Sequence, residues 1–471
     1  MKFKFIKCTS VLLCLVLSVT AFSGCYRIRK PSVKTNGIDY SCDFKRLNDG
    51  SLTGSVKLSE KEYIDIDFTR ETEFDTVELY ENGDNCNEFN IYVEKNGQWE
   101  LVYKQDRIMH YHLCFLGKHK SQKIRLEIAD CNKDVKIKEL TVSLAKKRTQ
   151  PVRVTQYLRF DVCDFETLLN DEGFSGYYDV VTDPIIFGEV YMDSNANICF
   201  YNSEEYFAKQ LSNLKKIIAD RDVRIWSCIF FDQTDDGGNK NHDATMNFVN
   251  NNIDKISENI KAFTEKYGLY GIDYDWEYPR SRAQWKAYDL MVEETAKFTK
   301  VSVALPPWQI RFSSSARKAV ENVNIMAYDL FDTRGDHSNC YNGGYEAIAK
   351  VREFGFDDSQ LLLGIPTYGR TTDKSEYAWP TIRDDGGDFG KWGKLVKDYP
   401  YTDSDTGEKK TCDAYLNSYA EARDKTAVAI DEGIGGVMIF RAFCDAPHTN
   451  EFSLHRAIGE TIEERTDSSM Q

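Results

Sequence analysis

Three acidic side chains stand at every second position of the segment 270–279, which reads YGIDYDWEYP. In an extended strand, residues two apart share a face and lie about 6.6 Å apart along the chain. Asp273, Asp275 and Glu277 would therefore line one face, opposite the apolar Ile272 and Trp276. Carboxyl groups confined this closely cannot all ionise cheaply, so at least one should keep its proton near neutral pH. The pattern indicates general acid catalysis, in which such a group protonates a leaving group.

Three other interpretations of this segment stay open at this point. The strand could be a solvated face, although its apolar opposite side and the following Pro279 argue against that. The oxygen atoms could bind Mg²⁺ or Ca²⁺. The segment could also be the remnant of a catalytic site that no longer works.

The elements that must position these acids follow Pro151, where apolar strand-like runs alternate with amphipathic helices. One helix places Ile253, Ile256 and Ile260 on one face and ends at Gly268. Eight runs in about 310 residues predict a (β/α)8 TIM barrel with insertions, which would point the acids into its interior. A doubly wound open sheet is the alternative, but no Gly-rich phosphate loop follows any run. The eight runs are Val152–Leu158, Pro184–Phe187, Val223–Phe230, Leu269–Glu277, Val301–Leu305, Val323–Tyr328, Leu361–Thr367 and Ile434–Phe440.

Residues 40–146 have a different pattern, with short runs of period two and turn signals such as Asn-Gly between them. This pattern predicts an antiparallel β-sandwich of the jelly-roll type. The order of its segments resembles a discoidin-like domain (coagulation factor 5/8 type C, galactose-binding-like), which implies either a glycan-binding module or a spacer. The polar stretch before Pro151 separates it from the barrel, residues 147–465. Because each part has its own apolar pattern, we expect a barrel fragment beginning near Lys146 to fold alone.

Residues 1–25 form an export leader, with three lysines among the first seven residues and an apolar stretch at 11–22. The stretch is too short to span a bilayer. Its end, Phe-Ser-Gly-Cys at 22–25, resembles a bacterial lipoprotein signal, with Phe22 where an aliphatic residue is usual. The resemblance implies that Cys25 is acylated and holds an exported protein on the bacterial membrane at the cell surface, after a linker at 26–39. An ordinary cleaved signal is the alternative.

Overall composition narrows the class of protein. Hydrophobic residues make up 41% and charged residues 29% of the 471 residues, which is ordinary globular usage. A net charge of −15 repels phosphate backbones, so we expect no nucleic-acid partner. An aromatic content of 13% suits stacking on sugar rings, although it also suits a large core. Ten cysteines follow the leader, and their pairing cannot be read from the sequence.

The acidic segment is similar to the signature of family 18 glycoside hydrolases, the chitinases and their relatives, whose pattern is Asp-x-x-Asp-x-Asp-x-Glu. Four further motifs follow in the order of that family, and the resemblance covers roughly residues 151–460. These motifs lie at 304–306, 326–329, 363–370 and 436–440.

The resemblance implies a role for each acidic residue. Glu277 would be the general acid and base, Asp275 would orient the substrate's acetamido group and share a proton with Glu277, and Asp273 would bias that proton. Tyr328 would hydrogen-bond the acetamido oxygen. In this family the substrate's own N-acetyl carbonyl is the nucleophile, an exception to the scheme with two enzyme carboxylates. The further substrate-binding candidates are Met326, Asp329, Phe440, Trp308 and Arg370.

The chain departs from the family pattern at three places. Tyr270 occupies the position of the first Asp, the third strand lacks the family's Ser-x-Gly-Gly, and Phe440 replaces the Trp that usually forms the floor of the sugar site. Trp308 and Trp379 follow strands five and seven, where they would be either sugar platforms or loop packing.

These observations predict a monomeric retaining hydrolase that cleaves β-1,4 bonds next to N-acetylglucosamine, with no cofactor and no metal ion. The glycan would be chitin, a chitooligosaccharide, the core of an N-linked glycan or peptidoglycan. The alternative is a glycan-binding, lectin-like protein on a degenerate barrel. An intact Glu277 favours the enzyme, whereas Tyr270 and Phe440 favour the lectin.

Overall fold

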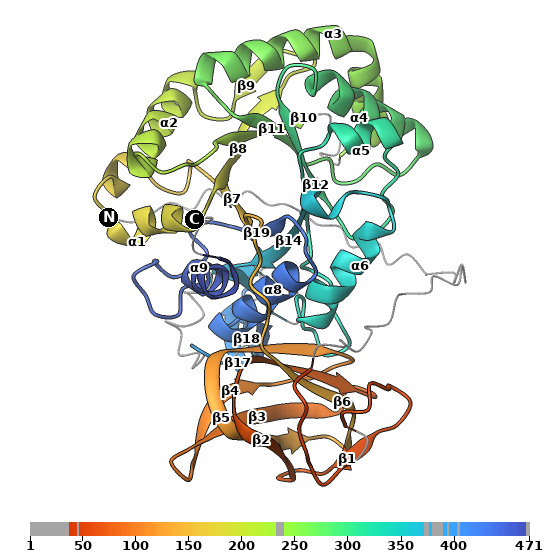
Figure 1. Ribbon diagram of the computed structural model, residues 1–471. Coiled ribbons are helices and arrows are strands. Elements are labelled where there is room, and N and C mark those ends of the chain that lie inside the picture. The colour runs from red at the N-terminus through yellow and green to blue at the C-terminus, as the bar shows by residue number, and fades with distance from the viewer. Residues whose placement is uncertain are drawn as a thin grey trace.

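The computed structural model describes residues 37–44, 47–231, 240–371, 376–378, 390–392, 395–402 and 406–467. These residues form an antiparallel β-domain, whose strands lie within residues 56–143, at the bottom of Figure 1, and a larger α/β barrel, whose strands and helices lie within residues 153–465, above it. Within these ranges, no helix has both the length and the apolar character needed to cross a membrane.

The β-domain is a six-stranded antiparallel sheet in the order β1-β6-β2-β5-β3-β4. The pairing of its two longest strands, β2 and β5, shifts register twice, between Asp67 and Thr72 and between Phe74 and Thr76. Side chains from both sides of these shifts, such as Ile66 and Val77, lie in one buried cluster, so the sheet folds around one core. The predicted antiparallel β-domain is confirmed, while the jelly roll and the discoidin-like relationship stay predictions. The strands are β1 (Val56–Leu58), β2 (Tyr63–Glu81), β3 (Cys86–Lys95), β4 (Gln98–Gln105), β5 (His112–Cys131) and β6 (Val135–Ser143).

The second part is a closed barrel of eight parallel strands. Each strand pairs with the next barrel strand in chain order, and the last one, β19, pairs with the first, β7. Because β8 pairs with both β7 and β10, no strand is left with an open edge and the barrel is closed. Every predicted run overlaps one of these strands, so the TIM barrel is confirmed and the open sheet is wrong. The barrel strands are β7 (Arg153–Leu158), β8 (Asp183–Met192), β10 (Trp226–Phe231), β11 (Gly271–Tyr274), β12 (Lys300–Leu305), β13 (Asn322–Ile325), β14 (Leu361–Pro366) and β19 (Gly436–Phe440). The short β9 (Ile198–Phe200) pairs antiparallel with β8.

Helices surround the barrel, and their amphipathic sequences explain why. In α3, Ile256 and Ile260 are buried on one face, and the helix stops at Gly268, which adopts the left-handed conformation with φ of 58°. Ser281 caps the next helix through a reciprocal capping box with Gln284. The main helices are α2 (Glu204–Ile218), α3 (His242–Tyr267), α4 (Arg282–Thr295), α5 (Ser314–Ala319), α6 (Ala347–Arg352), α8 (Tyr419–Asp431) and α9 (Leu454–Arg465).

Between β14 and α8 the chain forms a second small sheet that the sequence did not predict. It has the order β16-β15-β18-β17, and all its pairs are antiparallel. The strands are β15 (Tyr368–Thr371), β16 (Glu376–Ala378), β17 (Leu395–Thr402) and β18 (Lys409–Tyr415). The sheet therefore continues directly from the end of the seventh barrel strand.

The β-domain and the barrel share buried surface, contrary to the expectation of two independent cores. Tyr111 and Phe115 of β5 belong to the same apolar cluster as the helices of the barrel. On β2, the polar residues Thr76 and Glu78, which alternate with apolar ones, are only 1% and 0% exposed. The barrel covers that face, and Arg465 of α9 donates a hydrogen bond to Thr76. A period of two shows that a strand has two faces, but it does not show what covers the polar one.

Candidate active site

The acidic segment begins on β11 and continues past its carboxyl end, whereas the sequence predicted all three acids on the strand itself. β11 ends at Tyr274, so Asp275 and Glu277 belong to the loop beyond it. The side chains nevertheless continue to alternate between two sides, because Tyr274 and Trp276 are buried in the apolar cluster between the barrel strands and the helices. Asp273, which is 0% exposed, points to the opposite side, into the barrel.

Four buried donors hold Asp273. Its carboxylate accepts hydrogen bonds from the hydroxyl of Tyr157 at 2.9 Å and from the amide of Asn324 at 3.2 Å. The hydroxyl of Ser302 and the thiol of Cys228 also donate to it. Burial raises the pKa of Asp273 to about 6, and the four donors limit the rise because they stabilise the charged form. Asp273 is therefore an anion at neutral pH.

The next two acids form a pair. Burial, and then the charge of Glu277, raises the pKa of Asp275 well above its ordinary value, while Lys240 opposes the rise. Asp275 also shares a hydrogen bond with Glu277. Oδ1 of Asp275 is buried and has no hydrogen-bond partner among the residues that the structure describes. The expectation that at least one of the acids keeps a proton near neutral pH agrees with this arrangement.

Two features lie directly beside the acid pair. A cavity of about 40 Å³ is lined by Asp275 and Glu277 together with Lys240. Tyr278 donates a hydrogen bond to Glu277, and its ring lies 6.1 Å from the ring of Trp308. Trp308 is 41% exposed, so one face of its ring is accessible from solvent at the mouth of the barrel. The structure thus brings this predicted platform close to the acids.

A cluster of aromatic rings lies beside Asp273, which accepts a hydrogen bond from one of them, Tyr157. Phe440 stacks on Tyr328 with ring centroids 5.5 Å apart, and it also contacts Tyr157 at 5.7 Å and Phe187 at 5.8 Å. Met326 is buried in the same cluster. Burial raises the pKa of the Tyr328 phenol, so this hydroxyl stays protonated and can donate a hydrogen bond. The predicted residues Tyr328, Phe440 and Met326 are therefore together.

Asp329 and Arg370, two further predicted residues, form an ion pair with each other. Nε and Nη2 of Arg370 donate to Asp329 at 2.9 and 2.6 Å, and the Tyr368 hydroxyl donates at 3.1 Å. Burial alone would raise the pKa of Asp329, but the nearby His337 ring and the hydrogen bonds from Arg370 outweigh it and hold that pKa well below its ordinary range. Arg370 also lies 3.7 Å from Glu376 of the small sheet. A direct contact of Asp329 or Arg370 with a substrate stays a prediction.

Tyr270, which stands where the family pattern has its first Asp, packs among other side chains. Tyr270 lies 5.1 Å from Trp226, and the guanidinium carbon of Arg224 lies 5.1 Å from the Tyr270 ring centroid. Trp226 donates through Nε1 to the buried Asp183 at 2.9 Å. The departures at Tyr270 and on the third strand thus occur in one packed region below the acids.

Several residues of the site were not predicted from the sequence, namely Tyr157, Phe187, Cys228, Ser302 and Asn324. A signal for two of them exists, since Ser302 and Asn324 are polar residues inside otherwise apolar barrel strands. Of the other predictions, Trp379 and the lipid-anchor residue Cys25 lie outside the described residues. Within those residues no group of His, Cys, Asp and Glu side chains could hold a metal ion, and no disulfide joins the ten cysteines that they include.

Comparisons with known proteins place this geometry in a family. The family model of glycosyl hydrolases family 18 matches residues 181–445, more than half of the chain. Endochitinase 1 of Metarhizium anisopliae is 24% identical over 240 residues, which cover 40% of this chain and 55% of that protein. The chain spans about half the length of such curated relatives, or less.

Solved structures show the same fold at low identity. The GH18 chitinase ChiB from the chitin utilization locus of Flavobacterium johnsoniae has a TM-score of 0.52 at 20% identity, covering 67% of this chain and 94% of that one. The Bacillus cereus spore cortex-lytic enzyme SleL has a TM-score of 0.52 at 15% identity, covering 70% and 78%. These likenesses show the fold, and the family match over more than half of the chain shows that it belongs to the glycosyl hydrolases of family 18.

Proposed function

We propose that this protein is a retaining glycoside hydrolase that cleaves β-1,4 bonds next to N-acetylglucosamine by substrate-assisted catalysis. The observation that carries the proposal is the state of the three acids. Asp273 is buried and held by four donors, and Asp275, whose pKa is raised by burial and by the charge of Glu277, shares a hydrogen bond with Glu277. Family membership supports the same chemistry.

Each group has a task in this mechanism. Glu277 delivers the shared proton to the glycosidic oxygen, so the leaving sugar departs as an alcohol. The acetamido oxygen of the substrate attacks the anomeric carbon and forms an oxazolinium ring. Asp275, now an anion, accepts the hydrogen bond of the ring N–H, while the Tyr328 hydroxyl lies opposite the acetamido oxygen. Glu277 then takes a proton from the water that opens the ring, which regenerates the acid and retains the configuration.

The sugar ring would lie on Phe440. Phe440 stacks against Tyr328 and contacts Phe187, so its position is fixed by other rings. A phenyl ring offers a smaller stacking area than an indole. We therefore expect weaker sugar binding than a Trp would give, without loss of the acids. Trp308 would extend the platform beyond the cleaved bond.

Among N-acetylated glycans, chitin, chitooligosaccharides, the core of an N-linked glycan and peptidoglycan all fit this chemistry. The similar solved structures include a chitinase and a spore cortex-lytic enzyme. The acid pair acts on one N-acetylated sugar and the β-1,4 bond next to it. All four glycans contain this unit, so the acid pair does not distinguish between them.

The second candidate is a glycan-binding protein without turnover, which Tyr270 in place of the first Asp favours. The test is to incubate the purified protein with labelled chitooligosaccharides, chitin, N-glycoprotein and peptidoglycan, and to follow the products by NMR. The enzyme should release product first as the β-anomer. Binding to any of these glycans with no cleavage would establish the lectin instead.

We also propose that the protein is exported and held at the membrane through Cys25, on the basis of the lipoprotein-like end of the leader. A single acyl chain gives only marginal membrane binding, so a stable anchor needs more than one chain. Cys25→Ser should move the protein out of the membrane fraction or stop its processing. Unchanged partitioning and unchanged mature mass in that variant would overturn this proposal.

A further inference from the structure

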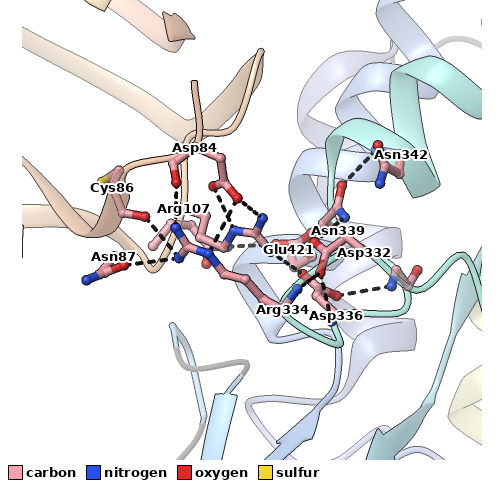
Figure 2. A network of polar contacts seen from close by, with 12 residues as sticks. Asp84, Cys86, Asn87, Arg107, Asp332, Arg334, Asp336, Asn339, Asn342 and Glu421 are labelled. Atoms are coloured by element: carbon pink, nitrogen blue, oxygen red, sulfur yellow. Dashed lines mark hydrogen bonds and ion pairs between the residues drawn. The ribbon is translucent and has the colours of Figure 1, made fainter. Parts of the chain in front are cut away.

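We call residues 330–339 the site loop. This loop follows Tyr328 and Asp329, which come after β13, and it contacts the β-domain at the mouth of the barrel. Figure 2 shows the polar contacts that join them. Arg107, which follows β4, has a side chain that is only 4% exposed. Its Nη1 donates to Asp332 Oδ2 at 2.5 Å and lies 3.8 Å from Asp336 Oδ2, while its Nε donates to Asp84 Oδ1 at 3.1 Å. One buried guanidinium of the β-domain is thus shared between its own domain and the site loop.

Arg334 makes the opposite connection, from the site loop into the β-domain (Figure 2). Its Nη2 donates to the carbonyl of Asp84 at 2.7 Å, and its Nη1 donates to Asn87 Oδ1 at 3.1 Å and to the carbonyl of Cys86 at 3.3 Å. Two arginines therefore cross the interface in opposite directions. Asp84 accepts hydrogen bonds from both arginines, so it fixes their positions relative to each other.

Asp332 organises the site loop itself. Its Oδ1 accepts hydrogen bonds from the backbone N–H groups of Arg334 at 2.8 Å and Asp336 at 3.2 Å, while its Oδ2 accepts from Arg107. The backbone N–H of Leu330 donates to the carbonyl of His337 at 2.9 Å, which closes the loop. The group that Arg107 holds is therefore the group on which the loop conformation depends.

The end of the site loop contacts both chain neighbours of Tyr328. Nδ1 of the buried His337 lies 3.3 Å from Oδ1 of Asp329. The hydroxyl of Ser338 donates to the carbonyl of Ala327 at 3.2 Å. Since Ala327 and Asp329 flank Tyr328, the loop determines the backbone position of this tyrosine from both sides.

Helix α8 makes a second connection between the same parts. Asp424 accepts from the hydroxyl of Tyr103 at 2.5 Å and from the backbone N–H of Phe115 at 2.7 Å, both in the β-domain. The next residue, Lys425, is fully buried and donates to the hydroxyl of Ser338 at 2.7 Å. Successive residues of one helix thus bind the β-domain and the site loop.

We infer that the β-domain positions the active site, and that Arg107 is a positioning residue that holds Tyr328 through Asp332 and the site loop. This inference rests on the proposed function, in which the Tyr328 hydroxyl binds the acetamido oxygen. A small displacement of a catalytic group lowers the rate strongly, because the bound geometry must match the transition state. Loss of the Arg107 contact should therefore lower kcat on the order of 10-fold, with a smaller change in KM.

The experiment compares four variants at three arginines of the full-length protein on a labelled chitooligosaccharide, with Arg107→Lys as the conservative change at Arg107. Arg107→Gln removes the charge at the site loop. Arg125→Gln is the matched control, because Arg125 makes the same kind of two-point contact with Asp65 within the β-domain, at 2.6 and 2.8 Å. Arg465→Gln controls for the interface as a whole, since Arg465 contacts Thr76 and Asp431 rather than the site loop. Rates are measured well below the lowest Tm of the set.

We expect a fall in kcat for Arg107→Gln, partial recovery in Arg107→Lys, and wild-type kcat for both controls even where their Tm falls. Hydrogen exchange of the backbone amides at 330–339 gives a second readout and should be faster only in the Arg107 variants. Unchanged kcat and unchanged exchange in Arg107→Gln would overturn the inference while the wild type still cleaves the oligomer. An equal fall of kcat in Arg107→Gln and Arg465→Gln would also overturn it, because the effect would then belong to the whole interface. A wild type that cleaves no glycan contradicts the proposed function instead, and in that case the exchange measurement decides the positioning role.

Discussion

Both ends of the barrel carry charged side chains, but the two ends differ in whether these charges have partners of opposite sign. At the amino end, a cavity of about 1240 Å³ is lined by groups such as Arg153, Arg224 and Glu321. These cations have carboxylate partners, with Arg224 at 2.6 Å from Asp183 and Arg153 at 3.7 Å from Glu321. At the carboxyl end the cavity beside the acids measures only about 40 Å³. Among the described residues, no ion pair includes Asp273, Asp275 or Glu277.

The difference shows that buried acidic groups without an ion-pair partner mark the reactive end of the barrel better than the size of a cavity does. A carboxylate next to an arginine stays ionised and contributes to stability. Neighbouring buried carboxyl groups outside an ion pair favour the protonated form, and the pKa of Asp275 is raised accordingly although Lys240 opposes the rise. In TIM barrels the active site lies at the carboxyl end of the strands, which agrees with this assignment.

The largest expected effect comes from removing the acid at the carboxyl end. Glu277→Gln keeps the shape of the side chain but cannot give up a proton to the leaving group. General acid–base catalysis contributes on the order of 10²–10⁴-fold, so kcat should fall at least that far while glycan binding survives. Steady-state rates and equilibrium binding of a chitooligosaccharide measure the two quantities. A variant that keeps more than a tenth of the wild-type kcat would remove Glu277 from the mechanism.

Tyr328→Phe should have the next largest effect. It removes one hydrogen bond to a developing charge, which is worth about 1.5–3 kcal/mol, so kcat should fall roughly 10–100-fold. The acid pair is untouched, so the pH profile should keep its shape. Phe440 still stacks on the remaining ring. The idea fails if kcat is unchanged, or if the pH profile shifts as much as in a variant of the acids.

Asp273→Asn should change the pH profile more than the maximum rate. The negative charge of Asp273 contributes to the raised pKa of Asp275, so the neutral amide lowers that pKa. Asp275 then loses its proton at lower pH, and the alkaline limb of kcat moves to lower pH. The acid limb that Asp273 produces near its pKa of about 6 should disappear. A profile with both limbs in their wild-type positions would contradict the coupling.

At the amino end we expect a loss of stability without a loss of activity. Arg224→Gln removes a charged partner of the buried Asp183, which keeps its hydrogen bond from Trp226. Leaving a buried charge short of one partner should lower the free energy of unfolding by about 1–3 kcal/mol. The kcat at 25 °C should stay within about two-fold of the wild type, since this group lies at the other end of the barrel. A 10-fold fall in kcat would mean that the two ends are coupled.

The barrel and its acids were predictable because their signals are local. Each barrel strand is an apolar run, and the alternation from Ile272 to Glu277 assigns the acids to one side whether or not the strand continues. The cap at Gly268 follows from the same kind of local rule. Patterns of this type depend only on neighbours in the chain.

The parts that could not be predicted depend on contacts between distant segments. Glu78 alternates with apolar residues as a solvated residue would, yet it is buried and accepts a hydrogen bond from Tyr111. Asp329 and Arg370 looked like separate ligands for a substrate, and only their three-dimensional arrangement shows that they pair. The crossing of Arg107 and Arg334 has no signal in either segment alone.

The most direct test of the central claim compares two matched substrates. Substrate assistance requires the 2-acetamido group, because its carbonyl is the nucleophile. The measurement is the rate of cleavage of a chitooligosaccharide and of the deacetylated oligomer of equal length, together with inhibition by a thiazoline mimic of the oxazolinium intermediate. We predict cleavage of the acetylated oligomer, none of the glucosamine oligomer, and inhibition by the mimic. Cleavage of both oligomers at similar rates would contradict the account even for an active enzyme.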